Sequence, residues 1–335
     1  MAKLTRILSI DGGGIRGIIP GQVLINVETK LKKLSGNADA KIADYFDLIA
    51  GTSTGGILTS IFLCPDKEKD SKRPRFSAKE AVELYLDRGD EIFDLSIWQK
   101  IKSGGGLIDE KYSAKDLEGA LEDYLGDLKL SELLKPCLIT AYDIQRRQTK
   151  FFTSHDAKVS TKENFYVKHV ARATSAAPTY FETARIKSFT NVAYPLVDGG
   201  VFANNPTLCA YAEARHKLKG KPRAADMAIL SIGTGFVKKA YDYNDAKDWG
   251  LVEWLKPILD IMMAGVSETI DYQLKQIFDA VGKPNQYLRI NGKLKNANSE
   301  MDDVSEDNLN ALVADAKRIA NENKNELDSF LKLLV

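Results

Sequence analysis

Residues 45–63 read Tyr-Phe-Asp-Leu-Ile-Ala-Gly-Thr-Ser-Thr-Gly-Gly-Ile-Leu-Thr-Ser-Ile-Phe-Leu. The apolar residues on both sides of the glycines predict a strand, a tight turn and then a helix. Ser53 stands on this turn between Gly51 and Gly55, which is typical of a nucleophile elbow. Such a turn lifts the serine hydroxyl above the sheet and aims it at the positive end of the helix. Glycines suit the turn because strained backbone angles and close packing leave no room for a Cβ atom.

Two further glycine turns also follow predicted strands. Asp-Gly-Gly-Gly-Ile-Arg-Gly occupies Asp11–Gly17, after a strand predicted over Arg6–Ile10. Asp-Gly-Gly occupies Asp198–Gly200, after a strand predicted over Tyr194–Val197. Sites in open α/β sheets gather at the carboxyl ends of the strands. If the three strands are neighbours, their turns therefore converge on one site.

The rest of the chain continues this alternation of strands and helices. Further strands are predicted over Pro136–Asp143, Ala228–Ile232 and Gln286–Ile290. The alternation predicts an α/β fold with a largely parallel sheet that helices cover on both faces. A single charged helix is predicted over Asp307–Val335, where apolar residues recur at helical spacing.

The composition limits the classes of partner and compartment. With 47 basic and 46 acidic residues, the chain has no charge excess that would favour nucleic acid. Cys64, Cys137 and Cys209 form neither a disulfide pattern nor a metal-binding spacing, which favours a reducing compartment. We see no signal-peptide pattern and no apolar run near the roughly 20 residues of a membrane span. We therefore expect a cytoplasmic protein that can contact membranes peripherally. Its oligomeric state stays open.

The serine and aspartate turns together suggest nucleophilic catalysis. Ser53 is the predicted nucleophile, and Asp198 is the predicted general base that takes the serine proton directly. A free aspartate is a weak base because its pKa is roughly 3.9, but burial can raise that pKa by up to roughly 3–5 units. This chemistry needs neither a metal nor another cofactor.

The first glycine turn supplies a complementary part. Backbone N–H groups of Gly12, Gly13 and Gly14 are predicted to form an oxyanion hole, since successive glycine amides at a helix start can point at one anion. Arg16 would support that loop or attract a phosphate head group. Gly51, Gly55 and Gly199 are predicted to support the other two turns.

Histidines offer an alternative to a direct dyad. The order Ser53, Asp198, His216 fits the α/β-hydrolase triad, but charged neighbours of His216 are typical of a solvated helix end. His155 lies in a polar loop, and the surroundings of His169 suit packing or the surface. The sequence therefore favours the dyad.

Two functions from other classes stay open. Gly12, Gly14 and Gly17 also match G-x-G-x-x-G after a strand, which would suit a phosphate- or nucleotide-binding protein. That interpretation requires a second strand with an acidic end about 20 residues later, where this chain instead has a helix end and a loop. The other function is a non-catalytic storage or scaffold protein.

An apolar stripe follows in residues 249–263. It would form an interfacial helix or a lid, although core packing is the more common cause of such a pattern. The residues of the stripe are Trp254, Leu255, Ile258, Leu259, Met262 and Met263.

The three glycine turns together resemble those of the patatin family of lipid acyl hydrolases. Other similar segments occur in the same order, and the resemblance covers residues 5–290. They are Ile42–Asp47, Ala173–Pro178, Asn204–Thr207 and Ile232–Gly235. The resemblance implies a three-layer α/β/α fold related to α/β hydrolases. It implies a Ser53–Asp198 dyad and an oxyanion hole at Gly12–Gly14, with Arg16 alongside.

The same resemblance implies the reaction, which is hydrolysis of acyl esters in phospholipids, lysophospholipids or galactolipids, without a metal. The partner would be a membrane or micellar lipid. We expect a patatin-like acyl hydrolase domain over residues 1–295 and a C-terminal helical extension over residues 296–335, packed on the same domain.

Overall fold

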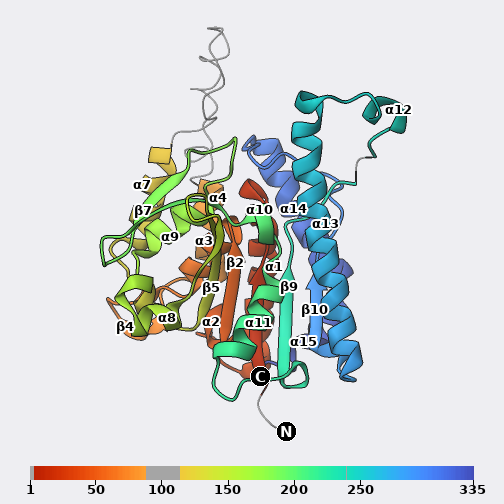
Figure 1. The fold of residues 1–335 in the computed structure, drawn as a ribbon. Helices are drawn as coiled ribbons and strands as arrows, with labels where there is room; N and C mark the ends of the chain where they lie inside the picture. The colour runs from red at the N-terminus through yellow and green to blue at the C-terminus, as the bar shows by residue number, and fades with distance from the viewer. Residues whose placement is uncertain (1–3, 88–113, 239) are drawn as a thin grey trace.

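The computed structural model describes residues 4–87, 114–238 and 240–335. Their centre is one sheet of eight strands (Figure 1). Five neighbouring strands are parallel, in the order β10 (Tyr287–Ile290), β9 (Met227–Ile232), β1 (Thr5–Ile10), β2 (Leu48–Thr52) and β5 (Cys137–Asp143). Three more strands enter the sheet through antiparallel pairs, namely β6 (Gln148–Phe152), β7 (Ala184–Lys187) and β8 (Ala193–Asp198).

Helices and a small hairpin complete the described part of the chain. The longer helices are α1 (Ile18–Ser35), α3 (Thr54–Phe62), α4 (Ala78–Asp87), α7 (Ala114–Leu125), α9 (Val167–Thr174), α11 (Thr207–Lys217), α13 (Leu251–Ala280), α14 (Glu306–Glu322) and α15 (Lys324–Leu331). The shorter ones are α2 (Ile42–Tyr45), α8 (Ser154–Val159), α10 (Gly200–Ala203) and α12 (Tyr243–Ala246). The hairpin pairs β3 (Pro65–Asp66) with β4 (Asp70–Pro74).

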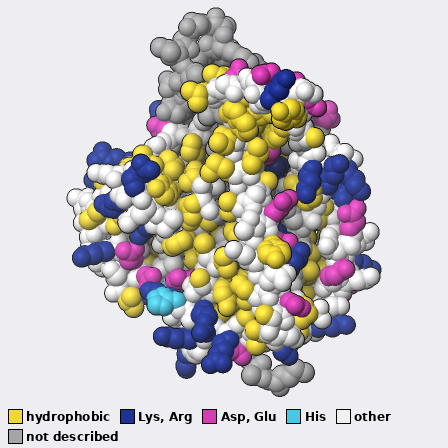
Figure 2. Space-filling model, turned by 45° about the vertical axis from the view of Figure 1, so that its right-hand side comes forward, with side chains coloured by type: hydrophobic (Ala, Val, Ile, Leu, Met, Phe, Trp, Pro, Cys, Tyr) yellow, Lys and Arg dark blue, Asp and Glu magenta, His cyan; other side chains and the backbone are white. Residues whose placement is uncertain are grey.

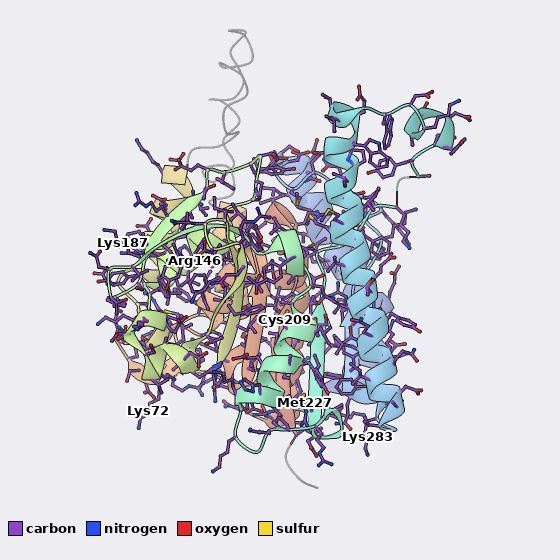
Figure 3. All side chains as sticks on the ribbon, in the orientation of Figure 1. Lys72, Arg146, Lys187, Cys209, Met227 and Lys283 are labelled. Atoms are coloured by element: carbon purple, nitrogen blue, oxygen red, sulfur yellow. The ribbon has the colours of Figure 1, made fainter. Side chains whose placement is uncertain are left out.

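Helices cover both faces of the sheet. Successive side chains of a strand point to opposite faces, and here the side chains on both faces are apolar and buried. Leu8 and Leu230 lie in a core cluster with α1, α3, α9 and α14. Ile7 and Ile229, one position away, lie in a second cluster with α11 and α13. Cys209 on α11 and Met227 on β9 mark this second layer (Figure 3). The predicted three-layer α/β/α fold with a mostly parallel sheet is therefore confirmed.

One edge of β5 accommodates two strands that run in opposite directions. β2 is parallel to β5 and ends with Thr52 beside Thr140. β8 is antiparallel to β5 and ends with Asp198 beside Ala141, the next residue along. Since β6 pairs with residues 139–143 on the other edge, β2 and β8 share the same edge and meet end to end. This meeting places the residue after β2 next to the last residue of β8.

The C-terminal segment packs on the first face of the sheet. Leu312 of α14 and Phe330 of α15 lie in the same core cluster as α1. Arg6 on β1 donates to the Leu334 carbonyl at 2.8 Å. The sequence predicted one long helix here, but the structure has two helices, separated at Asn323.

Candidate active site

Ser53 forms a strained turn between β2 and α3. Its backbone angles are φ 54° and ψ −123°, an unusual conformation for a residue with a side chain. The turn is tight enough that a Cβ atom on Gly51 would lie 2.1 Å from the Gly55 carbonyl oxygen. A Cβ atom on Gly55 would lie 2.2 Å from the carbonyl oxygen of Ile10. Both positions therefore require glycine, as the elbow pattern predicted.

Thr174 secures this turn. The Ser53 N–H donates to the Thr174 hydroxyl at 2.9 Å, and that hydroxyl donates to the Thr140 carbonyl at 2.6 Å. All three residues are buried. The sequence indicates only a family resemblance at Ala173–Pro178 and predicts no role for this threonine. The contact joins residues 121 positions apart, which no local pattern reveals.

Asp198 reaches Ser53 because β8 stops where β2 stops. Its side chain is 4 % exposed, and its Oδ1 accepts the Gly200 N–H at 2.7 Å. Burial raises the pKa of Asp198 to about 7, although hydrogen bonds with the Ser53 side chain and with Gly200 offset part of the rise. The structure thus brings the two residues together, and the pKa of the Asp198 carboxyl group lies near neutral pH. Gly199 is needed beside them, because a Cβ atom there would lie 2.0 Å from the Thr140 hydroxyl.

The first glycine turn differs from the prediction in one respect. The N–H of Gly12 already donates to the Asn204 carbonyl at 3.1 Å, so it does not donate to the oxygen of a substrate. The N–H groups of Gly13 and Gly14 have no hydrogen-bond partner within the described residues, and both glycines line the same cavity as Ser53. The predicted set of three amides therefore narrows to two. Gly14 has φ +59°, a conformation that suits glycine.

Several distant residues hold this turn in place. The Gly12 carbonyl accepts hydrogen bonds from the Thr234 hydroxyl at 2.9 Å and from the Asn204 side chain at 3.3 Å. The Ile15 N–H donates to the Met301 carbonyl at 2.8 Å, so the C-terminal segment also contributes. None of these supports was predicted, because each joins residues more than 190 positions apart.

Asp11 and Arg16 flank the turn with different roles. Asp11 is buried and forms a two-pronged ion pair with Arg289 of β10, with Nη1 and Oδ1 2.8 Å apart. The Nε of Arg16 donates to the Gly13 carbonyl at 3.4 Å, which places Arg16 as a support of the loop. Burial lowers the pKa of Arg16, and nearby Asp260, the first of the opposing groups, offsets part of that effect.

The structure does not assemble a Ser–His–Asp triad. None of the three histidines lines the cavity that contains Ser53. His155 instead lies 2.6 Å from a carboxylate oxygen of Glu213, and His216 is exposed in the last turn of α11. His169 lies near the start of α9.

The dinucleotide-binding alternative also lacks its second element. After α1 and the short helix α2, the chain enters β2, which is fully buried and leads directly into the Ser53 turn. An acidic residue at the end of this strand would be needed to bind a ribose. Gly51 and Thr52 occupy that end.

The cavity at Ser53 is mostly apolar. It has a volume of about 160 Å³ and is lined by Ser53, Asp198, Gly13 and Gly14 at its polar part. Most of its other lining residues are apolar and come from α3, α4, α7, the 177–181 segment and α13. They include Ile57, Tyr85, Leu117, Leu121, Phe181 and Met263. An apolar cavity with a few convergent polar groups suits a ligand with a hydrocarbon part and one reactive polar bond.

Comparison with known proteins agrees with this arrangement. The family model described as patatin-like phospholipase matches residues 8–211, more than half of the chain. The chain belongs to the patatin-like phospholipase family. It is 37 % identical to patatin-like protein 3 of Arabidopsis thaliana, over 93 % of this chain and 79 % of the plant protein. It is 35 % identical to patatin-like protein 2 of Oryza sativa subsp. indica, over 97 % and 86 %.

Membership of the patatin-like phospholipase family supports lipid acyl hydrolase activity in general. Another relative shows why the site itself matters. The potato protein named probable inactive patatin-3-Kuras 1, from Solanum tuberosum, is 32 % identical over 93 % of this chain and 85 % of its own length. Membership of the family therefore does not by itself establish activity.

Proposed function

We propose that this patatin-like protein is a serine acyl hydrolase that releases fatty acids from phospholipids, lysophospholipids or related acyl lipids. The observation that carries the proposal is the hydrogen-bonded pair of Ser53 and Asp198 at the polar part of an apolar cavity. The strained Ser53 turn supports it, as do the N–H groups of Gly13 and Gly14, which have no hydrogen-bond partner among the residues that the structure describes. A cytoplasmic location stays a prediction.

The reaction has two steps. Ser53 Oγ attacks the ester carbonyl carbon while Asp198 accepts the hydroxyl proton. The bond to the alcohol then breaks, and the alcohol leaves with that proton, which forms an acyl-enzyme. In the second step Asp198 accepts a proton from water as the water oxygen attacks the acyl carbon. Ser53 recovers the proton and the fatty acid is released.

The negative charge that develops on the carbonyl oxygen would be stabilised by the N–H groups of Gly13 and Gly14. One such donor typically contributes about 100- to 1000-fold in rate. Thr234 and Asn204 hold the preceding carbonyl, so the two donors are preorganised before substrate binds.

Covalent labelling tests the nucleophile. A fluorophosphonate is expected to add once, at Ser53, because the probe requires an activated hydroxyl beside oxyanion donors. Peptide mass spectrometry locates the adduct. Ser175 lines the same cavity, so the variant Ser175→Ala is a matched control and should label normally. An adduct elsewhere would contradict the assignment, and no adduct at all would favour a storage or scaffold protein.

The pH dependence tests the base. Because Asp198 has a pKa of about 7 and must be ionised to accept a proton, kcat/KM for a soluble ester should be half-maximal near pH 7. Well below pH 6 it should fall about tenfold per pH unit, as the ionised fraction does. A half-maximal point near pH 4 would show that burial does not set the pKa of the base.

A further inference from the structure

The first turns of α13 carry an exposed apolar surface. They extend past the end of the sheet where the Ser53 turn lies (Figure 1). We define the docking surface as Leu251, Val252, Trp254, Ile258, Ile261 and Met262. Leu251 is 94 % exposed and Val252 is 83 % exposed, so no part of the described chain covers them. Figure 2 shows apolar side chains gathered on the upper part of this side of the molecule.

The docking surface is continuous with the cavity. Met262 belongs to both, and Met263 beside it and the partly exposed Val201 also line the cavity that contains Ser53 and Asp198. An apolar path therefore leads from the outside of α13 to the reactive serine.

A row of aromatic side chains holds the surface together. Tyr241 and Trp249 pack edge to face with ring centres 5.4 Å apart, and Trp249 packs on Trp254 in the same way at 5.1 Å. The Tyr241 hydroxyl donates to Asp260 of α13 at 3.0 Å. These contacts tie the segment of α12 to α13. Tryptophan and tyrosine are also the residues that favour the interface between lipid and water.

The charge of this segment indicates which kind of lipid surface it binds. Residues 241–260 include five acidic residues and only two lysines, so this segment is net negative. Surfaces that bind anionic membranes are instead rich in lysine and arginine. The charges thus disfavour an anionic membrane and leave a surface of zwitterionic or uncharged lipids as the partner. None of the described helices has the length and apolar composition of a membrane-spanning segment.

We propose that the docking surface rests on a zwitterionic or uncharged lipid surface and delivers one lipid molecule from it to the cavity. The proposal rests on the proposed function, because it assumes that the lipid is the substrate of Ser53. It adds which face of the molecule meets the lipid and which head groups that face accepts.

A double variant, Leu251→Glu with Val252→Glu, tests the surface. Both side chains are exposed and lie outside the cavity, so the fold and the hydrolysis of a soluble short-chain ester should be unchanged. The affinity for phosphatidylcholine vesicles, measured by co-sedimentation, should fall at least about tenfold. Each of the two apolar side chains would bury enough area in the lipid to account for that factor. Hydrolysis of vesicle lipid should fall in parallel.

Tyr272→Glu is the matched control, because Tyr272 is 65 % exposed on α13 but lies outside the docking surface and the cavity. Its vesicle binding should equal that of the wild type. Unchanged vesicle binding by the double variant would overturn the proposal. So would stronger binding to anionic phosphatidylglycerol vesicles, or a wild-type dimer, seen by analytical ultracentrifugation, that the double variant dissociates.

The variant Ser53→Ala separates this proposal from the proposed function. It should bind phosphatidylcholine vesicles like the wild type while hydrolysing neither substrate. If the wild type binds these vesicles through the docking surface but hydrolyses no ester, the proposed function fails and the lipid-docking surface stands.

Discussion

Ser53→Ala is expected to lower kcat/KM for acyl-ester hydrolysis by about 10⁴-fold or more, the usual effect of removing a nucleophile from a serine hydrolase. The fold should survive, because the Ser53 N–H keeps its bond to Thr174 and the substitution removes only the hydroxyl. Lipid turnover measured by mass spectrometry, alongside thermal unfolding, checks both parts.

Ser175→Ala supplies the comparison, since Ser175 lines the same cavity and its hydroxyl has no hydrogen-bond partner among the described residues. It should keep most of the activity. Turnover by Ser53→Ala within a few-fold of the wild type would show that another group performs the attack. Loss of activity in both variants would point to damage to the cavity rather than loss of a nucleophile.

Asp198→Asn should abolish hydrolysis and yet stabilise the fold at neutral and higher pH. Asparagine can still accept the Gly200 N–H and contact Ser53, but it cannot accept the proton. In the wild type the raised pKa means that the folded state binds the proton more tightly than the unfolded state. That stabilising contribution is complete below about pH 4 and is lost as the pH rises through about 7.

The stability difference between Asp198→Asn and the wild type should therefore grow with pH. Between pH 5 and pH 8 the wild type is expected to lose about 2 to 3 kcal/mol relative to the variant, and the gap should level off above pH 8. Urea unfolding at several pH values measures this difference. A gap that is constant with pH would contradict a raised pKa.

Asp143→Asn is the matched control for this experiment. Asp143 is also buried, but its carboxylate pairs with Arg146 at 2.6 Å. Removing its charge leaves Arg146 without that partner, so the variant should lose stability at neutral pH. The opposite signs expected for two buried aspartates separate the effect of an unpaired charge from that of burial alone.

The sequence alone predicted much of the fold, because the signals for individual elements are local. Apolar runs bounded by glycines predicted β1, β2 and β9, and Gly51–Gly56 predicted the elbow before α3. The charged C-terminal pattern predicted a helix, but the break at Asn323 was missed. Both helices there keep apolar residues at helical spacing, so periodicity does not reveal a short interruption.

The details of the candidate site depended on contacts that the sequence does not display. The Asn204 carbonyl accepts the Gly12 N–H, whereas the N–H groups of Gly13 and Gly14 have no hydrogen-bond partner in the described part of the chain. The apolar stripe on α13 had core packing as its more common explanation, yet the structure exposes Trp254, Ile258 and Met262. Periodicity shows that a helix has an apolar face and does not show what covers that face.

By itself the sequence determined the turn that carries Ser53. The turn needs glycines at Gly51 and Gly55, which lie close to Ser53 in the chain and can be recognised there. It determined the layered α/β class for the same reason, through the alternation of strand and helix patterns. Only the tertiary structure decided how Asp198 reaches Ser53. The sequence predicts neighbouring strands that present their carboxyl ends together, whereas β8 is antiparallel to β5 and ends against β2. Only burial in that assembled fold raises the pKa of Asp198, because desolvation depends on everything packed around the carboxyl group.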